Sequence, residues 1–236
     1  MLIDWQAFRL TIELAVVVSG ILFVIALPLA WWIAFSRWRW KFFVEAMVAL
    51  PIVLPPTVLG FYVLVALGSH SPLGRWWQSL TGHTLAFTFT GLVIGSIFYS
   101  LPFAVQPFTA SFSSVDRKLL AASATLGASA WRTFFRIVVP LSLPGLVTGT
   151  VLAFAHTMGE FGVVLMIGGN IPGVTRTVSI AIYDQVQASN YAAANAMALL
   201  LLVFCFAVLT VVYALNRRTL PPGTPVPRSW TTGPVK

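Results

Sequence analysis

The chain has 236 residues, of which 58% are hydrophobic and 8% are charged, and its mean hydropathy is +0.89. Soluble domains carry about 25% charged residues, so this composition excludes an ordinary soluble protein and predicts that lipid surrounds most of the chain. The net charge of +8 does not indicate nucleic-acid binding, because the basic residues stand between apolar segments. A single cysteine, Cys205, excludes a disulfide within the chain.

Five apolar stretches are long enough to cross a bilayer as helices, which takes about 20 residues each. We therefore expect an all-α integral membrane protein with spans at roughly 14–35, 46–67, 85–108, 143–165 and 192–215. A sixth short or re-entrant segment is an alternative. The start of the chain lacks a basic region before the first span, so no cleavable signal peptide is expected. Residues 219–236 are rich in proline and are expected to form a disordered cytoplasmic tail.

The distribution of basic residues predicts the orientation of these spans, because cytoplasmic loops are enriched in Lys and Arg. Eleven fall on one side of the five-span arrangement and three on the other. The eleven are Arg37, Arg39, Lys41, Arg117, Lys118, Arg132, Arg136, Arg217, Arg218, Arg228 and Lys236, and the three are Arg9, Arg75 and Arg176. We expect an outside amino terminus and a cytoplasmic carboxyl terminus.

Prolines interrupt the second apolar stretch at Pro51, Pro55 and Pro56. A broken helix frees backbone polar groups, and these must be satisfied by protein or by a water-filled cavity. The second span is therefore expected to face a polar pathway through the protein, with a simple helix kink as the alternative.

The segment 113–140 lies between the third and fourth spans and contains two short helical patterns around Gly127. Ser113 or Ser114 is expected to cap the first helix, with Asp116 in its first turn. Pro140 is expected to end the second helix.

Residues 121–127 of this segment are small and nearly uncharged, so another protein can approach their backbone closely. A helix lying on the membrane surface is the alternative, and it would account for the aromatic face formed by Trp131, Phe134 and Phe135.

The segment resembles the EAA loop of ABC importer permeases, whose pattern is Glu-Ala-Ala, three residues, Gly, nine residues, and Ile-x-Leu-Pro. The spacing matches throughout, but Ala121 replaces the glutamate, Ser123 an alanine and Val139 a leucine. The resemblance implies that this loop docks on a separate ATP-binding subunit and transmits its motion. The loss of the glutamate puts a charged contact with that subunit in doubt. The implied coupling residues are Ala121, Ala122, Ser123, Leu126, Gly127, Ala128, Ile137 and Pro140.

The resemblance extends over residues 8–218 and implies a type-1 ABC transmembrane domain. The proline-broken second span, the stretch 159–162 and the following outer loop 169–177 are similar to molybdate and sulfate permeases. The stretches 170–173 and 181–183 look closer to the molybdate branch, and sulfate, thiosulfate and tungstate are the alternatives. The implied pathway or outer-gate residues are Pro51, Pro55, Pro56, Glu160, Asn170 and Arg176.

No P-loop pattern and no Cys/His cluster with metal-ligand spacing occurs, so we expect a transport subunit without its own ATPase site or metal. His156 and Glu160, four residues apart, are interpreted as a polar pair near the outer end of a span that faces the protein interior, with a ligand or proton pair as the alternative. The resemblance implies a location in the bacterial plasma (inner) membrane. It also implies a homodimer, two ATP-binding subunits that use ATP and Mg, and a periplasmic or surface-anchored oxyanion-binding protein. A secondary transporter or channel would need more ionisable residues within its spans, and a membrane scaffold would leave the spaced glycine loop unexplained.

Overall fold

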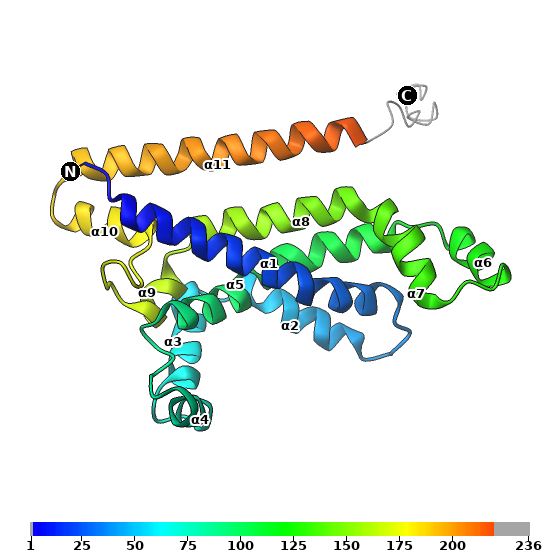
Figure 1. Ribbon diagram of the computed structural model, residues 1–236, viewed down its shortest axis with the longest axis horizontal. Coiled ribbons are helices and arrows are strands. Elements are labelled where there is room, and N and C mark those ends of the chain that lie inside the picture. The colour runs from blue at the N-terminus through cyan, green and yellow to red at the C-terminus, as the bar shows by residue number, and fades with distance from the viewer. Residues whose placement is uncertain (1, 220–236) are drawn as a thin grey trace, which may run out of the picture.

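The computed structural model describes residues 2–219, which form helices joined by short loops, with no β-strand in that range. The helices are α1 (Trp5–Phe35), α2 (Lys41–Val53), α3 (Pro56–Leu67), α4 (Pro72–Thr81), α5 (Phe89–Ser113), α6 (Arg117–Thr125), α7 (Ala130–Thr133), the π-helical η1 (Phe134–Val138), α8 (Val139–Gly159), α9 (Gly162–Gly168), α10 (Val178–Gln187) and α11 (Tyr191–Thr219). Figure 1 shows the long helices lying roughly along one axis of the molecule.

Four helical runs of the described chain are long and apolar enough to cross a membrane. They are α1, α5, the run Ala130–Gly159 made by α7, η1 and α8, and the part Tyr191–Ala214 of α11. The helices α2 and α3 pass the same test only together, and they meet at a bend of 112°. The structure thus confirms an all-helical membrane fold, with a fifth span if the bent pair crosses as one.

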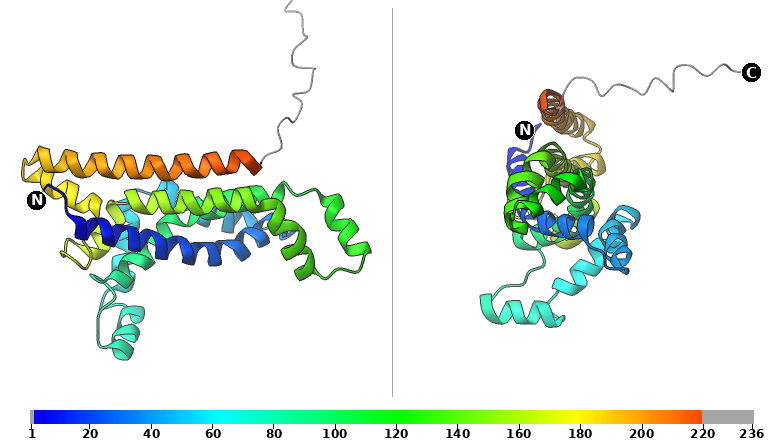
Figure 2. Two further views of the ribbon diagram at one scale, coloured as in Figure 1. Left: turned by 45° about the horizontal axis from the view of Figure 1, so that its top comes forward. Right: turned by 90° about the vertical axis from the view of Figure 1, so that its right-hand side faces the viewer.

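The two ends of the molecule differ in what they carry. The N-terminus, α9, α10 and the start of α11 lie at one end of the long axis, whereas α6 and α7 lie at the other (Figures 1 and 2). Near the first end, α3 and α4 project sideways from the bundle. The loop segment and the outer segments of the sequence are therefore separated by the full length of the bundle.

The core of the bundle is made by α1, α5 and α8, which pack against one another along their lengths. Small residues allow α5 and α8 to approach closely, as is common between helices in membranes. A methyl group at Gly149 of α8 would lie 2.8 Å from the Phe108 ring of α5. Three residues further along α5, the Ser111 hydroxyl donates to the Ser142 carbonyl oxygen of α8 at 3.1 Å.

The break between α2 and α3 follows from the prolines at Pro55 and Pro56. Leu54 is extended, with φ −73° and ψ 139°, as residues before proline prefer. Beyond the break, α3 packs against α9, where a methyl group at Gly60 would lie 2.8 Å from Met166 Cβ. The expected interruption of the second span is thus present, and it is a sharp bend rather than a mild kink.

Several helix limits differ from the approximate limits expected for the spans. The fourth span was expected to run to Leu165, but α8 ends at Gly159 and the chain restarts as α9 at Gly162. A tertiary contact lies beside this break: Gly162 approaches Pro56 so closely that a methyl group there would lie 2.6 Å from Pro56 Cβ. The first span starts earlier than expected, at Trp5, and the third is shifted to Phe89–Ser113.

Two helices were also missed, since α4 and α10 lie in segments interpreted only as outer loops. Both are short, so their apolar patterns were not separated from loop sequence. The predicted disordered tail lies outside the described residues, except Thr219, the last residue of α11.

Candidate functional site

The loop at one end of the bundle is built from α6, a tight turn, and α7. Asp116 is the N-cap of α6, and its side chain accepts a hydrogen bond from the Lys118 amide at 2.8 Å. The expectation of a Ser113 or Ser114 cap is wrong, because Ser113 still belongs to α5 and Ser114 follows as its C-cap. A carboxylate is a good N-cap because it accepts from free amides and complements the helix dipole.

The turn between the two helices depends on Gly127. Its φ is 71°, in the left-handed region that glycine enters without steric cost. The Gly127 amide donates to the Ala124 carbonyl oxygen at 3.0 Å, and the Ala128 amide donates to that of Ser123 at 3.1 Å. No atom lies within 4 Å of a methyl group placed at Gly127, so the backbone conformation alone demands glycine.

A hydroxyl pair joins the two arms of the loop. Ser123 of α6 and Thr133 of α7 have their hydroxyl oxygens 2.6 Å apart, and Ser123 is buried. On the outer surface, Ala121, Ala122 and Gly127 are exposed, and Leu126 is 86% exposed. The loop therefore exposes small residues and Leu126 on its outer surface, and the contact between the Ser123 and Thr133 hydroxyls holds its two arms together.

The link from this loop to the spans differs from the expected one. Pro140 does not end a helix; it lies in the first turn of α8, and helix continues from α7 through η1. In η1 the Val139 amide donates to the Phe134 carbonyl oxygen, five residues back. Since proline cannot occupy the interior of an ordinary α-helix without losing a hydrogen bond, this wider π turn carries the chain past it.

Aromatic contacts anchor η1 to the core. The Phe134 ring centroid lies 4.7 Å from that of Trp31 on α1 and 6.0 Å from that of Phe112 on α5. Phe134 and Val138 are both buried, and Ile137 is partly buried. Phe134 therefore connects the loop to both α1 and α5.

A second candidate region is a pocket of about 540 Å³ beside the break between α8 and α9. Of the expected pathway residues, Pro56 and Glu160 line it, whereas Pro51 and Pro55 do not. Thr57, Tyr99 and His156 also line it. The structure thus brings together polar groups from α3, α5 and α8 at the point where both proline-rich and glycine-rich segments are broken.

The polar side chains around this pocket form a partly connected group. His156 Nδ1 lies 3.0 Å from the Ser100 hydroxyl, which lies 2.9 Å from the Thr157 hydroxyl. Ser96 lies beside the Glu160 carboxyl group, but neither side chain completes a hydrogen bond with any described residue. The interior position expected for His156 and Glu160 is thus observed, although His156 bonds to Ser100 rather than to Glu160.

Tyr99, Ser100 and Ser96 were not singled out from the sequence. The sequence does mark them, because three hydroxyl side chains fall within five residues of an otherwise apolar span. Polar residues at membrane depth mark pathways by default, and hydroxyls deserve to be counted alongside ionisable groups.

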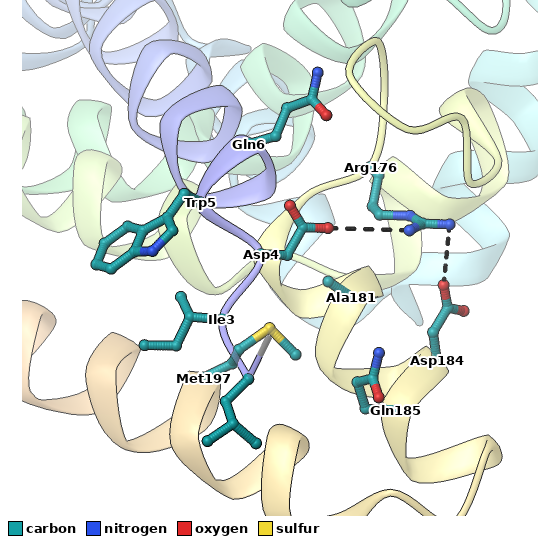
Figure 3. Close-up of a pocket in the computed structure, with 10 residues that line it drawn as sticks. Ile3, Asp4, Trp5, Gln6, Arg176, Ala181, Asp184, Gln185 and Met197 are labelled. Carbon is teal, nitrogen blue, oxygen red and sulfur yellow. Dashed lines mark ion pairs between the residues drawn. The ribbon is translucent and has the colours of Figure 1, made fainter.

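At the opposite end of the bundle from the loop, Arg176 joins three segments around a pocket of about 390 Å³ (Figure 3). Its Nε donates to Asn170 Oδ1 at 2.6 Å, and its guanidinium nitrogens lie 3.9 Å from Asp4 Oδ2 and 3.6 Å from Asp184 Oδ2. Asn170 Nδ2 in turn donates to Asp184 Oδ2 at 2.6 Å. Two of the expected outer-gate residues, Asn170 and Arg176, therefore meet.

Arg176 is paired with acidic side chains from two other segments. Two carboxylates accompany one guanidinium, so the three charges sum to a negative value. The geometry favours a tie between the N-terminal segment, the loop 169–177 and α10 over an isolated anion-attracting charge.

Comparison with known proteins gives a consistent result. Residues 26–221 match the family model described as binding-protein-dependent transport system inner membrane component. The chain is 52% identical over 214 residues to the molybdenum transport system permease protein ModB of Azotobacter vinelandii, covering 91% of this chain and 95% of that protein. It is 38% identical to ModB of Escherichia coli (strain K12), covering 78% and 80%.

More distant similarities are to a sulfate permease and to solved structures of ABC transporters. A probable sulfate transport system permease protein of Zygnema circumcarinatum is 32% identical, over 88% of this chain and 72% of that one. Among solved structures, a bacterial ABC transporter that imports alginate superposes with a TM-score of 0.75 at 17% identity, covering 92% of this chain and 79% of the other. A second alginate transporter structure, in complex with a pentasaccharide-bound periplasmic protein, also gives 0.75 at 18% identity, covering 93% and 80%. At these identities the structures establish the fold.

Proposed function

Since this chain belongs to the family of binding-protein-dependent transport system inner membrane components, we propose that it is the permease subunit of an ABC importer for molybdate. In this role it forms the membrane pathway through which a tetrahedral oxyanion enters the cell. The observation that carries the substrate assignment is the 52% identity to a molybdenum permease over nearly the whole length of both chains.

Sulfate and thiosulfate are weaker candidates, because the sulfate permease is the more distant of these relatives at 32% identity. Tungstate stays a candidate for a physical reason: tungstate and molybdate have nearly the same size and charge. We expect the permease to pass both and an external binding protein to perform most of the selection.

The proposed machine contains two copies of this chain, two ATP-binding subunits and an external binding protein. A dianion needs a polar route through hydrocarbon, because its transfer into an apolar medium is strongly unfavourable. One chain of about five spans is too thin to enclose such a route in two alternating conformations, so a symmetric pair is the economical arrangement. In the proposed complex, ATP and Mg bind to the partner subunits and not to this chain.

Coupling is assigned to the exposed unit of α6, Gly127 and α7. Closure of the ATP-binding subunits moves this unit, and η1 passes the motion to α1 and α5 through Phe134. The pocket beside Glu160 is the proposed part of the pathway, because there polar groups from three elements meet at the breaks of two spans.

The test is ATP-driven uptake by the complete complex in lipid vesicles. We expect labelled molybdate and tungstate to accumulate, and sulfate to accumulate far less. A complex whose ATP-binding subunits carry a substituted P-loop lysine is the control, and it should accumulate none of them. Preferential uptake of sulfate, or uptake without ATP hydrolysis, would contradict the proposal.

A further inference from the structure

The break between α8 and α9 holds a buried carboxyl group that has no partner. Glu160 follows Gly159, the last residue of α8, and is only 4% exposed. Neither of its carboxyl oxygens takes part in a hydrogen bond with residues 2–214, and no basic side chain in that range pairs with it. Burial of an unpaired carboxylate is strongly unfavourable, so an acid in such a place keeps its proton.

The groups around Glu160 do not supply a counter-ion. Four helices line the pocket beside it, and the titratable side chains that they bring are Tyr99 of α5 and His156 of α8, with none from α3 or α9. His156 is engaged elsewhere, because its Nδ1 lies 3.0 Å from the Ser100 hydroxyl. Ser96, beside the carboxyl group, offers only a neutral hydroxyl. The surroundings therefore suit an uncharged Glu160.

The same break is where water can reach the carboxyl group. Glu160 lines the pocket of about 540 Å³, but both of its oxygens are covered in this conformation. Two of the elements that bound the pocket, α3 and α9, pack closely, with Gly60 against Met166 and Gly162 against Pro56. A charged Glu160 needs hydration, and pocket water reaches its oxygens only when the side chain or α9 moves.

We propose that Glu160 is a proton switch for this break: its protonated form stabilises the packing of α9 against α3, and loss of the proton to pocket water loosens that packing. Because the conformation described here binds the proton, it is favoured at low pH and is lost as the pH rises. The consequence for oxyanion uptake rests on the function proposed above. Proton binding and its effect on α9 do not.

Proton binding is tested by infrared spectroscopy of the full chain in lipid nanodiscs. The titration runs from about pH 6 to about pH 9, because buried glutamic acids can titrate as high as about pH 8–9. We expect a carbonyl band of a protonated carboxyl group that disappears as the pH rises and that Glu160→Gln removes. Glu13→Gln is the matched control: Glu13 is exposed and pairs with Arg9, so its loss should leave the band unchanged. Absence of the band at low pH, or its persistence in Glu160→Gln, would overturn the proposal.

The effect on α9 is tested with spin labels at two exposed positions, Tyr62→Cys on α3 and Ile171→Cys just beyond α9, in a Cys205→Ser background. We expect the distribution of distances between the labels to broaden or lengthen as the pH rises, and to keep its low-pH form at every pH when Glu160→Gln is added. A distribution that is constant in the parent chain, or that changes equally with Glu160→Gln, would contradict the switch.

Two further variants assign the titration. Glu160→Asp keeps a carboxyl group and should retain the dependence of the label distance on pH. His156→Gln removes the neighbouring imidazole and should retain it as well. Loss of the pH dependence in His156→Gln but not in Glu160→Gln would assign the switch to the histidine and overturn the proposal.

Uptake is tested last, with the complete complex in vesicles at the two ends of this pH range. We expect uptake by the wild type to be severalfold lower at low pH, and uptake by Glu160→Gln to stay at that low level at both, since glutamine imitates the protonated form. Uptake by Glu160→Gln that follows the wild-type profile, or that stays at the wild-type high-pH level, would overturn the effect on transport. If no complex transports any oxyanion, the proposed function fails, while the infrared and distance results stand or fall by themselves.

Discussion

At the turn between α6 and α7, Gly127 has a φ of 71° and open space around it, so its role is to supply a backbone conformation. At the other end, Arg176 contacts Asn170, Asp4 and Asp184 and ties three segments together. Gly127 thus sets a backbone turn at one end of the bundle, and Arg176 connects three segments at the other.

The turn predicts the effect of Gly127→Val. A β-branched residue in the left-handed region is strained by ~1–3 kcal/mol, and the loop is expected to relieve this by moving its two arms apart. ATP-driven uptake should fall on the order of tenfold or more, while the amount of folded protein in the membrane stays near that of the wild type. The core does not include Gly127, so burial of the spans is unaffected.

The matched control is Gly127→Asn, because asparagine enters the left-handed region more readily than other residues do. It should retain most of the uptake. A Gly127→Val complex that transports at the wild-type rate, with its ATP-binding subunit still attached, would refute the coupling assignment.

Helices α5 and α8 show how elements of this fold are held together. Their interface is close because Gly149 faces Phe108 and because Ser111 and Ser142 bond across it. Polar groups near the pocket, such as Ser100 with His156 and Thr157, join the same two helices. The interface between α5 and α8 therefore combines close packing with hydrogen bonds between side chains that lipid could not satisfy.

This packing predicts a difference between two glycines in long helices. Gly149→Ala places a methyl group against Phe108, and overpacking of this kind costs ~1–3 kcal/mol. Gly20→Ala in α1 meets no atom within 4 Å and improves helix propensity by up to ~1 kcal/mol. In detergent, the temperature at which the monodisperse protein is lost should fall for Gly149→Ala and stay level or rise for Gly20→Ala. Equal shifts would show that the α5–α8 contact is looser than described.

At the scale of the whole molecule, the two ends are chemically distinct. One end carries the exposed loop with Arg117, Lys118, Arg132 and Arg136, and the other carries the Arg176 network and the N-terminus. Figure 1 shows these ends separated along the long axis of the molecule. The helix α11 packs against α8 and α10 with little of its surface buried, so most of it is open to lipid or to a second chain.

The charge asymmetry predicts the topology. Reporter fusions at Gly82 and Gly173 should give outside signals, and those at Ser129 and Thr219 inside signals. The decisive position is Gly82, which follows the bent pair of α2 and α3. An inside signal there would mean that the pair enters and leaves on the same side, and the five-span arrangement would be wrong.

Composition and pattern alone determined the class of this protein and its approximate spans, because about twenty apolar residues are needed to cross hydrocarbon and long apolar runs have few other uses. The spacing around Gly127 likewise determined the position of the loop, since a reversal between two helices needs a residue that accepts positive φ. The break of α8 at Glu160, the helix passing through Pro140, and the meeting of Tyr99, His156 and Glu160 were decided only by the tertiary structure. These features depend on contacts between distant segments, such as Gly162 against Pro56 and Ser100 against His156, and no local pattern encodes which segments will meet.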